Sequence, residues 1–422
     1  MPKFVHEHER GLLIEGQDDI SYRLEFSPFR LVQMVDGEET VIVNDSDDLY
    51  YDAKNLHAGE HHSRQHHSNG LGEDELIQGY SVGLDFTFAS NHLYGIPERA
   101  TKMLLEKTGY ENPYRLFDQD LFPHSFGDPS PLYGSVPYIM GHNELNDASV
   151  AWMNSAETFV FINDSHHAGH LSTAFLSQGN TLEFYLLGSR ESPKNLQKKL
   201  SELTGYPPMP PLHSLGYHFS KWENNTAEMI MDRNEDFSKH NYPVDVFWFD
   251  IEFSQNKGYF EFDRLRFPQN KMMQMNEQVE KKDRRFVVIN DPHVYADQSY
   301  FVYKEGIAMD GKKTKTGETM SPFIKDPLAG KPWIGKCWPG ESVWYDFLNT
   351  NTQDYYESLF HPSVYRGTNY MYGIWNDMNE PSVFKGTEEI EQLGMPMNNT
   401  HTMADGSILQ HRWVHNAYGA LH

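Results

Sequence analysis

The sequence predicts two regions of different fold class, an all-β sandwich over residues 1–205 and an α/β region over residues 206–422. In the first, short apolar runs are separated by Gly, Asn, Asp and Pro, which is typical of a sandwich of short strands. In the second, strand and helix patterns alternate, which implies parallel strands joined by right-handed crossovers. The proline-rich segment Tyr206–Pro211 predicts a stiff junction between the two.

The first region contains ten runs that fit strands. They are GLLIEG, YRLEFS, RLVQMV, ETVIVND, SVGLDFTF, HLYGIP, SVPYIMG, ASVAWMN, ETFVFIND and LEFYLLG. Lys194–Leu203 predicts a short helix at its end. Residues 52–75 are polar and rich in histidine, and we expect an exposed loop there. The spacing of its histidines fits no established metal-ligand set, so a solvated loop is favoured over a metal site. These histidines are His57, His61, His62, His66 and His67.

The second region contains four runs that fit buried parallel strands, with helices between them. The expected strands are Leu212–Phe219, Val244–Phe249, Phe286–Ile289 and Met371–Trp375. The expected helices are Ala227–Lys239, Asn270–Arg284 and most of Val343–Phe360. The short apolar run Met371–Trp375 suits a strand that is covered on both faces, and Pro381 prevents its continuation.

Each of these strands ends in polar residues. The first leads into His218 and Trp222, and the others lead into Asp250 with Glu252, Asp291 with His293, and Asp377. A single acidic strand end is common, because Asp and Asn are turn residues. Four polar ends on one edge of a parallel sheet instead indicate a site, since α/β folds place their chemistry there.

Bulk properties exclude some classes of function. The net charge of −25 argues against a nucleic-acid partner, which requires a basic surface. No run approaches the length of a membrane helix, and the N-terminus lacks the apolar core of a signal peptide. Cys337 is the single cysteine, so an intrachain disulfide is impossible. Four Asn-x-Ser/Thr triplets are a weak hint of glycosylation. They begin at Asn44, Asn163, Asn224 and Asn398.

Paired carboxylates favour glycoside hydrolysis, in which one carboxylate attacks the anomeric carbon and a second, protonated carboxyl assists the leaving oxygen. A hard divalent cation is the alternative ligand for such a cluster, but no calcium-loop pattern and no HExxH motif is present. The aromatic content of 14% fits a sugar-binding cleft as well as a β-rich core. Trp222, Trp338 and Trp375 are the candidate sugar-facing side chains.

The segment WNDMNEPSVF at 375–384 resembles the nucleophile motif of family 31 glycoside hydrolases, in particular their neutral α-glucosidase (glucosidase II) branch. Ordered matches cover nearly the whole chain. They include VGLDFTF, PYRLFDQDLF, LYGSVP, PPLHSLGYHFSKW, DVFWFDIE, INDPHV, CWPG and HRWVHNAYG. The resemblance implies a galactose-mutarotase-like β-sandwich followed by a (β/α)8 barrel, of which about the first half is covered. It also implies a retaining, exo-acting α-glucosidase that uses neither metal nor cofactor.

The resemblance assigns roles by position. Asp377 matches the nucleophile, and Asp250 and Ile251 match residues that touch the sugar. Trp338, Trp375 and Met378 match positions that line the pocket. Asp120 matches an aspartate on a sandwich loop that reaches the active site, and Glu380 and Asp291 are expected to support the strand ends.

The implied substrate is an α-glucoside or a glucosylated N-linked glycan, the implied partner is a non-catalytic β-subunit, and the implied location is the lumen of the endoplasmic reticulum. Trp413 stands where relatives usually carry Asp, and no residue matches the family's acid/base aspartate. The chain is therefore expected to be a fragment that is inactive on natural glucans. Two alternatives stay open, another specificity within the family and a non-catalytic carbohydrate-binding protein.

Overall fold

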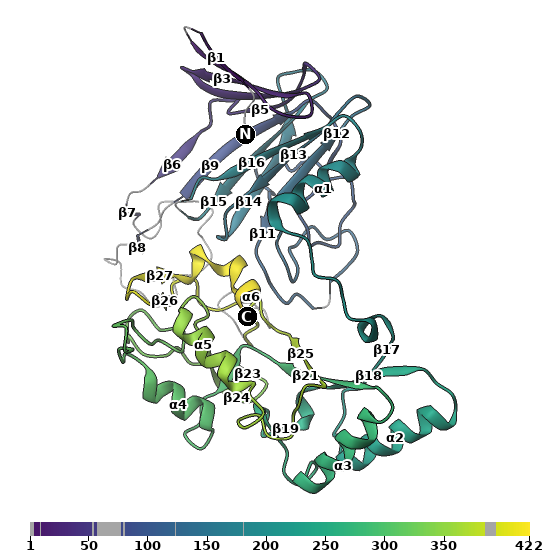
Figure 1. Ribbon diagram of the computed structural model, residues 1–422. Coiled ribbons are helices and arrows are strands. Elements are labelled where there is room, and N and C mark those ends of the chain that lie inside the picture. The colour runs from purple at the N-terminus through teal and green to yellow at the C-terminus, as the bar shows by residue number, and fades with distance from the viewer. Residues whose placement is uncertain are drawn as a thin grey trace. The chain divides into compact units, whose positions relative to one another are not determined.

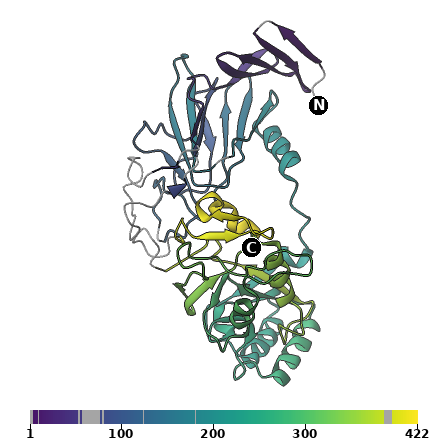
Figure 2. The same cartoon turned by 90° about the vertical axis from the view of Figure 1, so that its left-hand side faces the viewer.

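The computed structural model describes residues 4–8, 10–52, 55–56, 77–78, 81–122, 124–179, 181–384 and 394–422 (Figures 1 and 2). The five histidines of the segment 52–75 lie outside these residues. The chain forms two compact units. The sandwich unit comprises Met1–Pro207 and Arg412–Ala417, and the parallel-sheet unit comprises Pro208–His411 and Tyr418–His422. Among the described residues, no helix is long and apolar enough to cross a membrane.

The sandwich unit contains two antiparallel sheets. A ten-stranded sheet has the order β1-β2-β3-β4-β5-β9-β15-β14-β11, with β6 also paired to β9, and a four-stranded sheet has the order β10-β12-β13-β16. A further pair joins Asn55–Leu56 (β7) to Ile77–Gln78 (β8). The larger sheet consists of β1 Phe4–His8, β2 Gly11–Glu15, β3 Ile20–Phe26, β4 Phe29–Val35, β5 Glu38–Val43, β6 Tyr50–Asp52, β9 Ser81–Phe88, β11 Tyr114–Leu116, β14 Thr158–Asp164 and β15 Leu171–Ser177. The smaller sheet consists of β10 Leu93–Gly95, β12 Tyr138–His142, β13 Asp147–Trp152 and β16 Phe184–Ser189.

The two sheets share an apolar core. Phe86 on β9 packs edge-to-face on Trp152 of β13, with ring centroids 6.2 Å apart, and both rings are fully buried. Such edge-to-face contacts add to the free energy gained from burying the rings. Helix α1 (Pro193–Thr204) packs against β13 and β16 and buries Leu196.

Strand β15 was not expected from the sequence. Its side chains alternate between buried and half-buried, but two of the four buried positions are the polar residues Thr173 and Ser177. Both are hydrogen-bonded: the Thr173 hydroxyl donates to the Phe86 carbonyl, and the Ser177 hydroxyl accepts from the indole N–H of Trp152. The satisfied polar groups make the strand stable while weakening its hydrophobic pattern.

Residues 412–417 complete the sandwich unit. Asn416 accepts a hydrogen bond from the backbone N–H of Asp118 at 3.0 Å and donates to the carbonyl of Leu116 at 3.1 Å. The ring of His415 stacks on Phe117, and its Nε2 lies 2.7 Å from the carbonyl oxygen of Asp118. The carboxyl group of Asp118 is buried, and this burial raises its pKa to about 7.

The parallel-sheet unit is built on four parallel strands in the order β17-β18-β21-β25. They are Tyr217–Ser220, Val244–Phe249, Arg285–Asn290 and Tyr372–Asn376. Its helices are α2 Ala227–Lys239, α3 Gln269–Glu280, α4 Phe301–Met309, α5 Thr350–Leu359 and α6 Tyr418–Leu421. Its remaining strands are the pair β19 Ser254–Gln255 and β20 Gly258–Phe262, the sheet β22 His293–Tyr295, β24 Gly340–Trp344 and β23 Gly335–Cys337, and the pair β26 Thr400–Thr402 and β27 Ile408–Gln410.

Helix α2 has the predicted bounds, because Thr226 caps its first turn by accepting from the N–H of Met229 at 3.1 Å. Strands β18 and β21 are buried inside the sheet. Phe247, Phe249 and Phe286 are fully buried and form part of one apolar cluster with residues of α2 and α3.

Four predictions for this unit are wrong in part. The helix expected over Asn270–Arg284 ends at Glu280. Residues 212–215 form a 3-10 turn rather than strand, because Ser214 donates its N–H and its hydroxyl to the carbonyl of Pro211. Val343 lies in β24, and the helix begins only at Thr350, where Asn349 caps it. Strand β25 is not covered on both faces: Ile374 is 42% exposed, since β25 lies at the edge of the described sheet.

Candidate active site

Three aspartates follow the carboxyl ends of three adjacent parallel strands. Asp250 follows β18, Asp291 follows β21 and Asp377 follows β25. Asn290 pairs with Asn376 in the register of β21 and β25, so the next residues, Asp291 and Asp377, start at the same level of the sheet edge. Parallel strands expose this edge as a common surface, and the predicted convergence of the strand-end carboxylates is found here.

Asp377 is half-buried and lies within electrostatic range of Asp250. Burial is the main cause of the raised pKa of the Asp377 carboxyl, and the charge of Asp250 raises it further. The next residue, Met378, adopts a left-handed conformation with φ of 55°, and its backbone N–H donates to the Asp377 carboxylate. Left-handed non-glycine residues concentrate at functional sites, where the surrounding structure holds the strain.

The segment after Asp377 is attached to the β23–β24 hairpin. Ser382 donates its N–H to the carbonyl of Met378, and Phe384 donates to the carbonyl of Lys336 on β23. The same hairpin carries Trp338, whose ring packs on Phe384 with centroids 4.7 Å apart. The hairpin therefore fixes both Trp338 and the turn that follows Asp377.

Asp250 has a similar backbone environment. Its Oδ1 accepts from the N–H of the following residue, Ile251, at 2.7 Å. Burial raises the pKa of the Asp250 carboxyl, and the charge of Glu252 raises it further. The side chain of Ile251 is only 4% exposed and belongs to the apolar core, so it supports the turn from inside the fold.

Asp291 is the most deeply buried of the three aspartates, at 3% exposure. The hydroxyl of Tyr259 donates to its Oδ2, and Nε2 of His293 lies 3.7 Å from the same oxygen. Burial raises the pKa of Asp291 well above its usual range, and the charges of Asp377, Asp250 and Glu380 act in the same direction. Burial also lowers the pKa of His293 to about 3, so this imidazole is neutral.

Aromatic rings surround the strand ends. Trp375 packs on Trp248 with centroids 5.2 Å apart, and the indole N–H of Trp248 donates to Nδ1 of His218 at 2.8 Å. Trp338 stacks on His293 at 5.7 Å. Trp222 is 70% exposed and donates to Glu252. Sugar faces bind to such rings through their apolar C–H groups.

The sequence-predicted residues divide between the two units. Seven of them belong to the parallel-sheet unit near the strand ends or on the hairpin attached there, and Glu380 is buried four residues after Asn376. Asp120 belongs to the sandwich unit, where it is 6% exposed on the segment after β11. Sequence reasoning missed Tyr259, which reaches Asp291 from the hairpin formed by β19 and β20. One tyrosine among 24 carries no signal for such a contact.

Comparison with known proteins identifies the family of both units. The family described as "Glycosyl hydrolases family 31 TIM-barrel domain" matches residues 207–422, and the "Glycosyl hydrolase 31 N-terminal galactose mutarotase-like domain" matches residues 2–160. The fold class expected from the sequence, a sandwich followed by part of a barrel, is confirmed.

Individual relatives give the same result. Human neutral alpha-glucosidase C is 32% identical over 97% of this chain and 47% of its own length. Glucosidase 2 subunit alpha of Schizosaccharomyces pombe is 33% identical over 93% of this chain and 42% of its own length. The chain thus spans less than half the length of these curated relatives.

Among solved structures, a glucosidase II alpha subunit bound to Glc1Man2 superposes with a TM-score of 0.84 at 30% identity, covering 99% of this chain and 45% of that chain. A Flavobacterium johnsoniae GH31 dextranase, at 17% identity and a TM-score of 0.72, shares the fold. With more than half of its residues matched by one family description and most of the remainder by its partner domain, the chain belongs to glycosyl hydrolase family 31.

Proposed function

We propose that this chain carries the nucleophile half of a retaining exo-α-glucosidase, with Asp377 as the nucleophile. The observation that carries the proposal is the position of Asp377, at the carboxyl end of a parallel strand, beside Asp250 and with Met378 holding the turn. Asp250, Met378, Trp338 and Trp375 then bind the sugar, and Asp291 and Glu380 support the strand ends. Asp120 is proposed as a further sugar contact from the sandwich unit.

The first chemical step follows from the carboxylate. An ionised Asp377 oxygen attacks the anomeric carbon, the bond from that carbon to the leaving group breaks with its electron pair, and a glycosyl ester forms. The N–H of Met378 orients the attacking carboxylate without neutralising it. A natural sugar leaving group requires a proton donor, whereas fluoride leaves without one. An activated substrate therefore isolates the step that Asp377 performs.

The decisive experiment is trapping of the ester. A fluorinated α-glucosyl fluoride that slows hydrolysis of the ester is incubated with the 422-residue chain, and the digested protein is analysed by mass spectrometry. We expect label on the peptide containing Asp377. In Asp377→Asn the trapping rate falls by at least about 1,000-fold, the scale of losing a covalent nucleophile. Label on another residue, or undiminished label in the variant, contradicts the assignment.

We propose terminal α-linked glucose on N-linked glycans as the substrate. The support comes from the relatives, which are named neutral alpha-glucosidases and glucosidase II alpha subunits. Trapping rates with matched α-glucosyl and α-xylosyl fluorides separate this specificity from others in the family, and we expect the glucosyl probe to react faster by at least tenfold. Glycan binding that is unaffected by Asp377→Asn, without any trapping, would instead favour a carbohydrate-binding protein.

Two further proposals come from one solved relative, described as an ER glucosidase II heterodimeric complex of a catalytic subunit and the binding domain of a regulatory subunit. By analogy, we place this chain in the endoplasmic-reticulum lumen with a non-catalytic subunit as partner. Co-expression with that binding domain followed by size-exclusion chromatography tests the partner. Separate elution of the two chains rules out a stable complex.

A further inference from the structure

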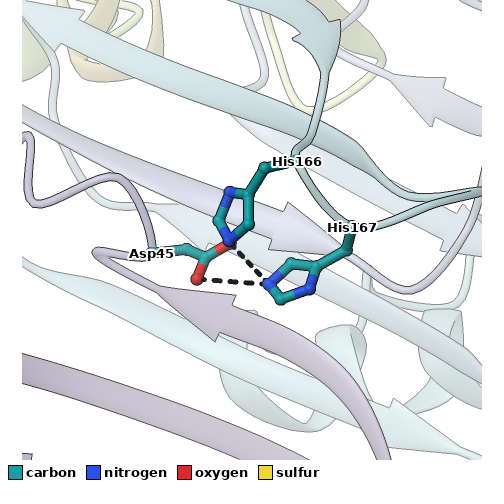
Figure 3. A group of neighbouring side chains, drawn as sticks. All are labelled: Asp45, His166 and His167. Atoms are coloured by element: carbon teal, nitrogen blue, oxygen red, sulfur yellow. Dashed lines mark hydrogen bonds and ion pairs between the residues drawn. The ribbon is translucent and has the colours of Figure 1, made fainter.

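Two adjacent histidines and one buried aspartate lie side by side in the sandwich unit (Figure 3). Asp45 lies in the turn after β5, and His166 and His167 lie in the loop between β14 and β15. Strand β9 separates β5 from β15 in the sheet, so the cluster joins two segments that are not hydrogen-bonded neighbours. We call Asp45, His166 and His167 the Asp-His-His cluster.

The donor atoms converge with spacings that suit a metal ion. Nε2 of His167 lies 3.2 Å from Oδ2 of Asp45, and Nε2 of His166 lies 3.8 Å from the same oxygen. All three ligand atoms lie within 4.8 Å of one another. Zinc bonds of roughly 2.0–2.2 Å in a tetrahedral site place neighbouring ligand atoms about 3.4 Å apart. Only small side-chain movements are needed to bind the ion.

In the cluster the aspartate is buried, whereas the two histidines are accessible to solvent. The Asp45 side chain is 1% exposed, and its Oδ2 receives no hydrogen bond in the described structure. Nε2 of His167 also lies 3.5 Å from the other oxygen, Oδ1. A buried carboxylate oxygen that receives no hydrogen bond, as Oδ2 here, is costly unless a cation compensates it. The imidazoles, at 62% and 40% exposure, face solvent and leave an approach for an ion.

The surrounding charges favour a cation. Asp45 and Asp48 both raise the pKa of Asp85, which places three carboxyl groups in one neighbourhood. Arg30 is the nearby guanidinium, and it bonds the backbone oxygen of Asp45 and lies 3.5 Å from Oδ1. Oδ2 thus stays available on the side of the histidines.

We propose that the Asp-His-His cluster binds one divalent transition-metal ion, with Zn²⁺ as the best fit. Two imidazoles and one carboxylate suit a borderline-soft ion, whereas Ca²⁺ and Mg²⁺ prefer sites made of oxygen. Three protein ligands leave the fourth position to water. The bound ion links the turn after β5 to the β14–β15 loop and thereby stabilises the sandwich unit.

The test must separate this cluster from the histidine-rich segment. In a background variant, His57, His61, His62, His66 and His67 are changed to Ser. Titration of this metal-free 422-residue protein with ZnCl₂ in a calorimeter is expected to give one equivalent bound. His166→Gln and His167→Gln, made in the same background, each weaken binding by more than 100-fold. His124→Gln, an exposed histidine of the same unit outside the cluster, leaves it unchanged.

Cobalt provides a second readout that does not depend on affinity. Co²⁺ in a tetrahedral site absorbs strongly in the visible range, and this absorption is expected in the background variant and absent in His167→Gln. Because His167 is partly exposed, its replacement leaves the fold intact, which circular dichroism verifies. Zinc binding that is lost in the background variant, or kept in both cluster variants, overturns the proposal.

Discussion

Buried aspartates in the two units differ in the charge of their neighbours. At the ends of β18, β21 and β25, the charge of Asp250 raises the pKa of Asp377, and both charges raise the pKa of Asp291. Among the residues that the structure describes, no ion pair with a Lys or Arg side chain offsets the burial of these three carboxyls. In the Asp-His-His cluster, Asp45 instead meets two imidazoles and the guanidinium of Arg30.

The two environments offset the free-energy cost of a buried carboxylate in different ways. When carboxyl groups lie close together, the negative charge of one disfavours ionisation of the next and raises its pKa. Raised pKa values of this kind are common in hydrolytic sites. A carboxylate beside imidazoles can be neutralised by a metal ion that all of them ligate. Under the functions proposed above, the same residue type would serve nucleophilic attack in one unit and cation binding in the other.

Asp118 gives the largest expected effect, because it is a buried carboxyl in the sandwich unit whose pKa is raised mainly by that burial. Its pKa is about 7 in the folded protein and near 3.8 unfolded, so the folded state holds a proton that the unfolded state has lost between these pH values. The sandwich unit therefore loses stability as pH rises from 4 to 7, by up to about 4 kcal/mol, and none further above.

Asp118→Asn is expected to remove this pH dependence, measured by hydrogen exchange of the β14 amides in urea. Asp36→Asn, an exposed site in the same unit, is the matched control and retains the slope. An unchanged slope in Asp118→Asn would assign the effect to another group.

The pH dependence of ester trapping at Asp377 tests the raised pKa of this carboxyl group. Attack requires the ionised carboxylate, so the rate falls about tenfold per pH unit below the raised pKa, or about 100-fold over two units. Asp250→Asn removes a neighbouring negative charge and is expected to move this decline to lower pH. Asp354→Asn, on the exposed side of α5, is expected to leave it in place. Coincident profiles for Asp250→Asn and the parent would show that the two carboxyls do not interact.

Zinc should stabilise only the sandwich unit. At a free concentration of 100 times Kd, binding adds about 2.7 kcal/mol to the free energy of unfolding. Thermal unfolding of the histidine-depleted variant, with and without ZnCl₂, measures this shift, which His167→Gln abolishes. Equal shifts in both proteins would mean that zinc acts elsewhere.

The smallest expected effect concerns the proton donor to Asp291. Tyr259→Phe removes the hydroxyl that bonds Oδ2 and leaves a buried acceptor unsatisfied, which costs about 1–3 kcal/mol. Tyr345→Phe is the control, since the buried hydroxyl of Tyr345 has no hydrogen-bond partner in the described structure. Urea unfolding of the parallel-sheet unit compares them, and equal losses would contradict a specific role for the Tyr259 bond.

Much of the fold could be predicted where local pattern and tertiary environment agree. Val244–Phe249 is a buried central strand with the predicted bounds, and α2 begins at its Thr226 cap as its sequence indicates. The prediction failed where tertiary contacts override the pattern. Val343 on β24 pairs with Val294 of β22 although its surroundings resemble a helix, and β15 places Thr173 and Ser177 inside.

The two candidate sites also differ in how far they could be predicted from the sequence. The strand-end aspartates could be predicted because each follows a recognisable strand and parallel strands bring their ends together. The Asp-His-His cluster could not, because Asp45 lies more than 100 residues before His166 and nothing in either segment specifies the fold of the β14–β15 loop. Contacts between distant loops depend on backbone geometry that no local spacing encodes.

The last residues of the sandwich unit have a consequence for synthesis on the ribosome. His415 and Asn416 emerge roughly 200 residues after Pro207, which at about 5–20 residues per second is a delay of roughly 10 to 40 seconds. During this interval the N–H of Asp118 and the carbonyl of Leu116 lack the hydrogen bonds that Asn416 later forms with them. A nascent chain stalled before Arg412 should therefore carry a sandwich that proteases cut more readily near residues 116–118 than in the 422-residue chain.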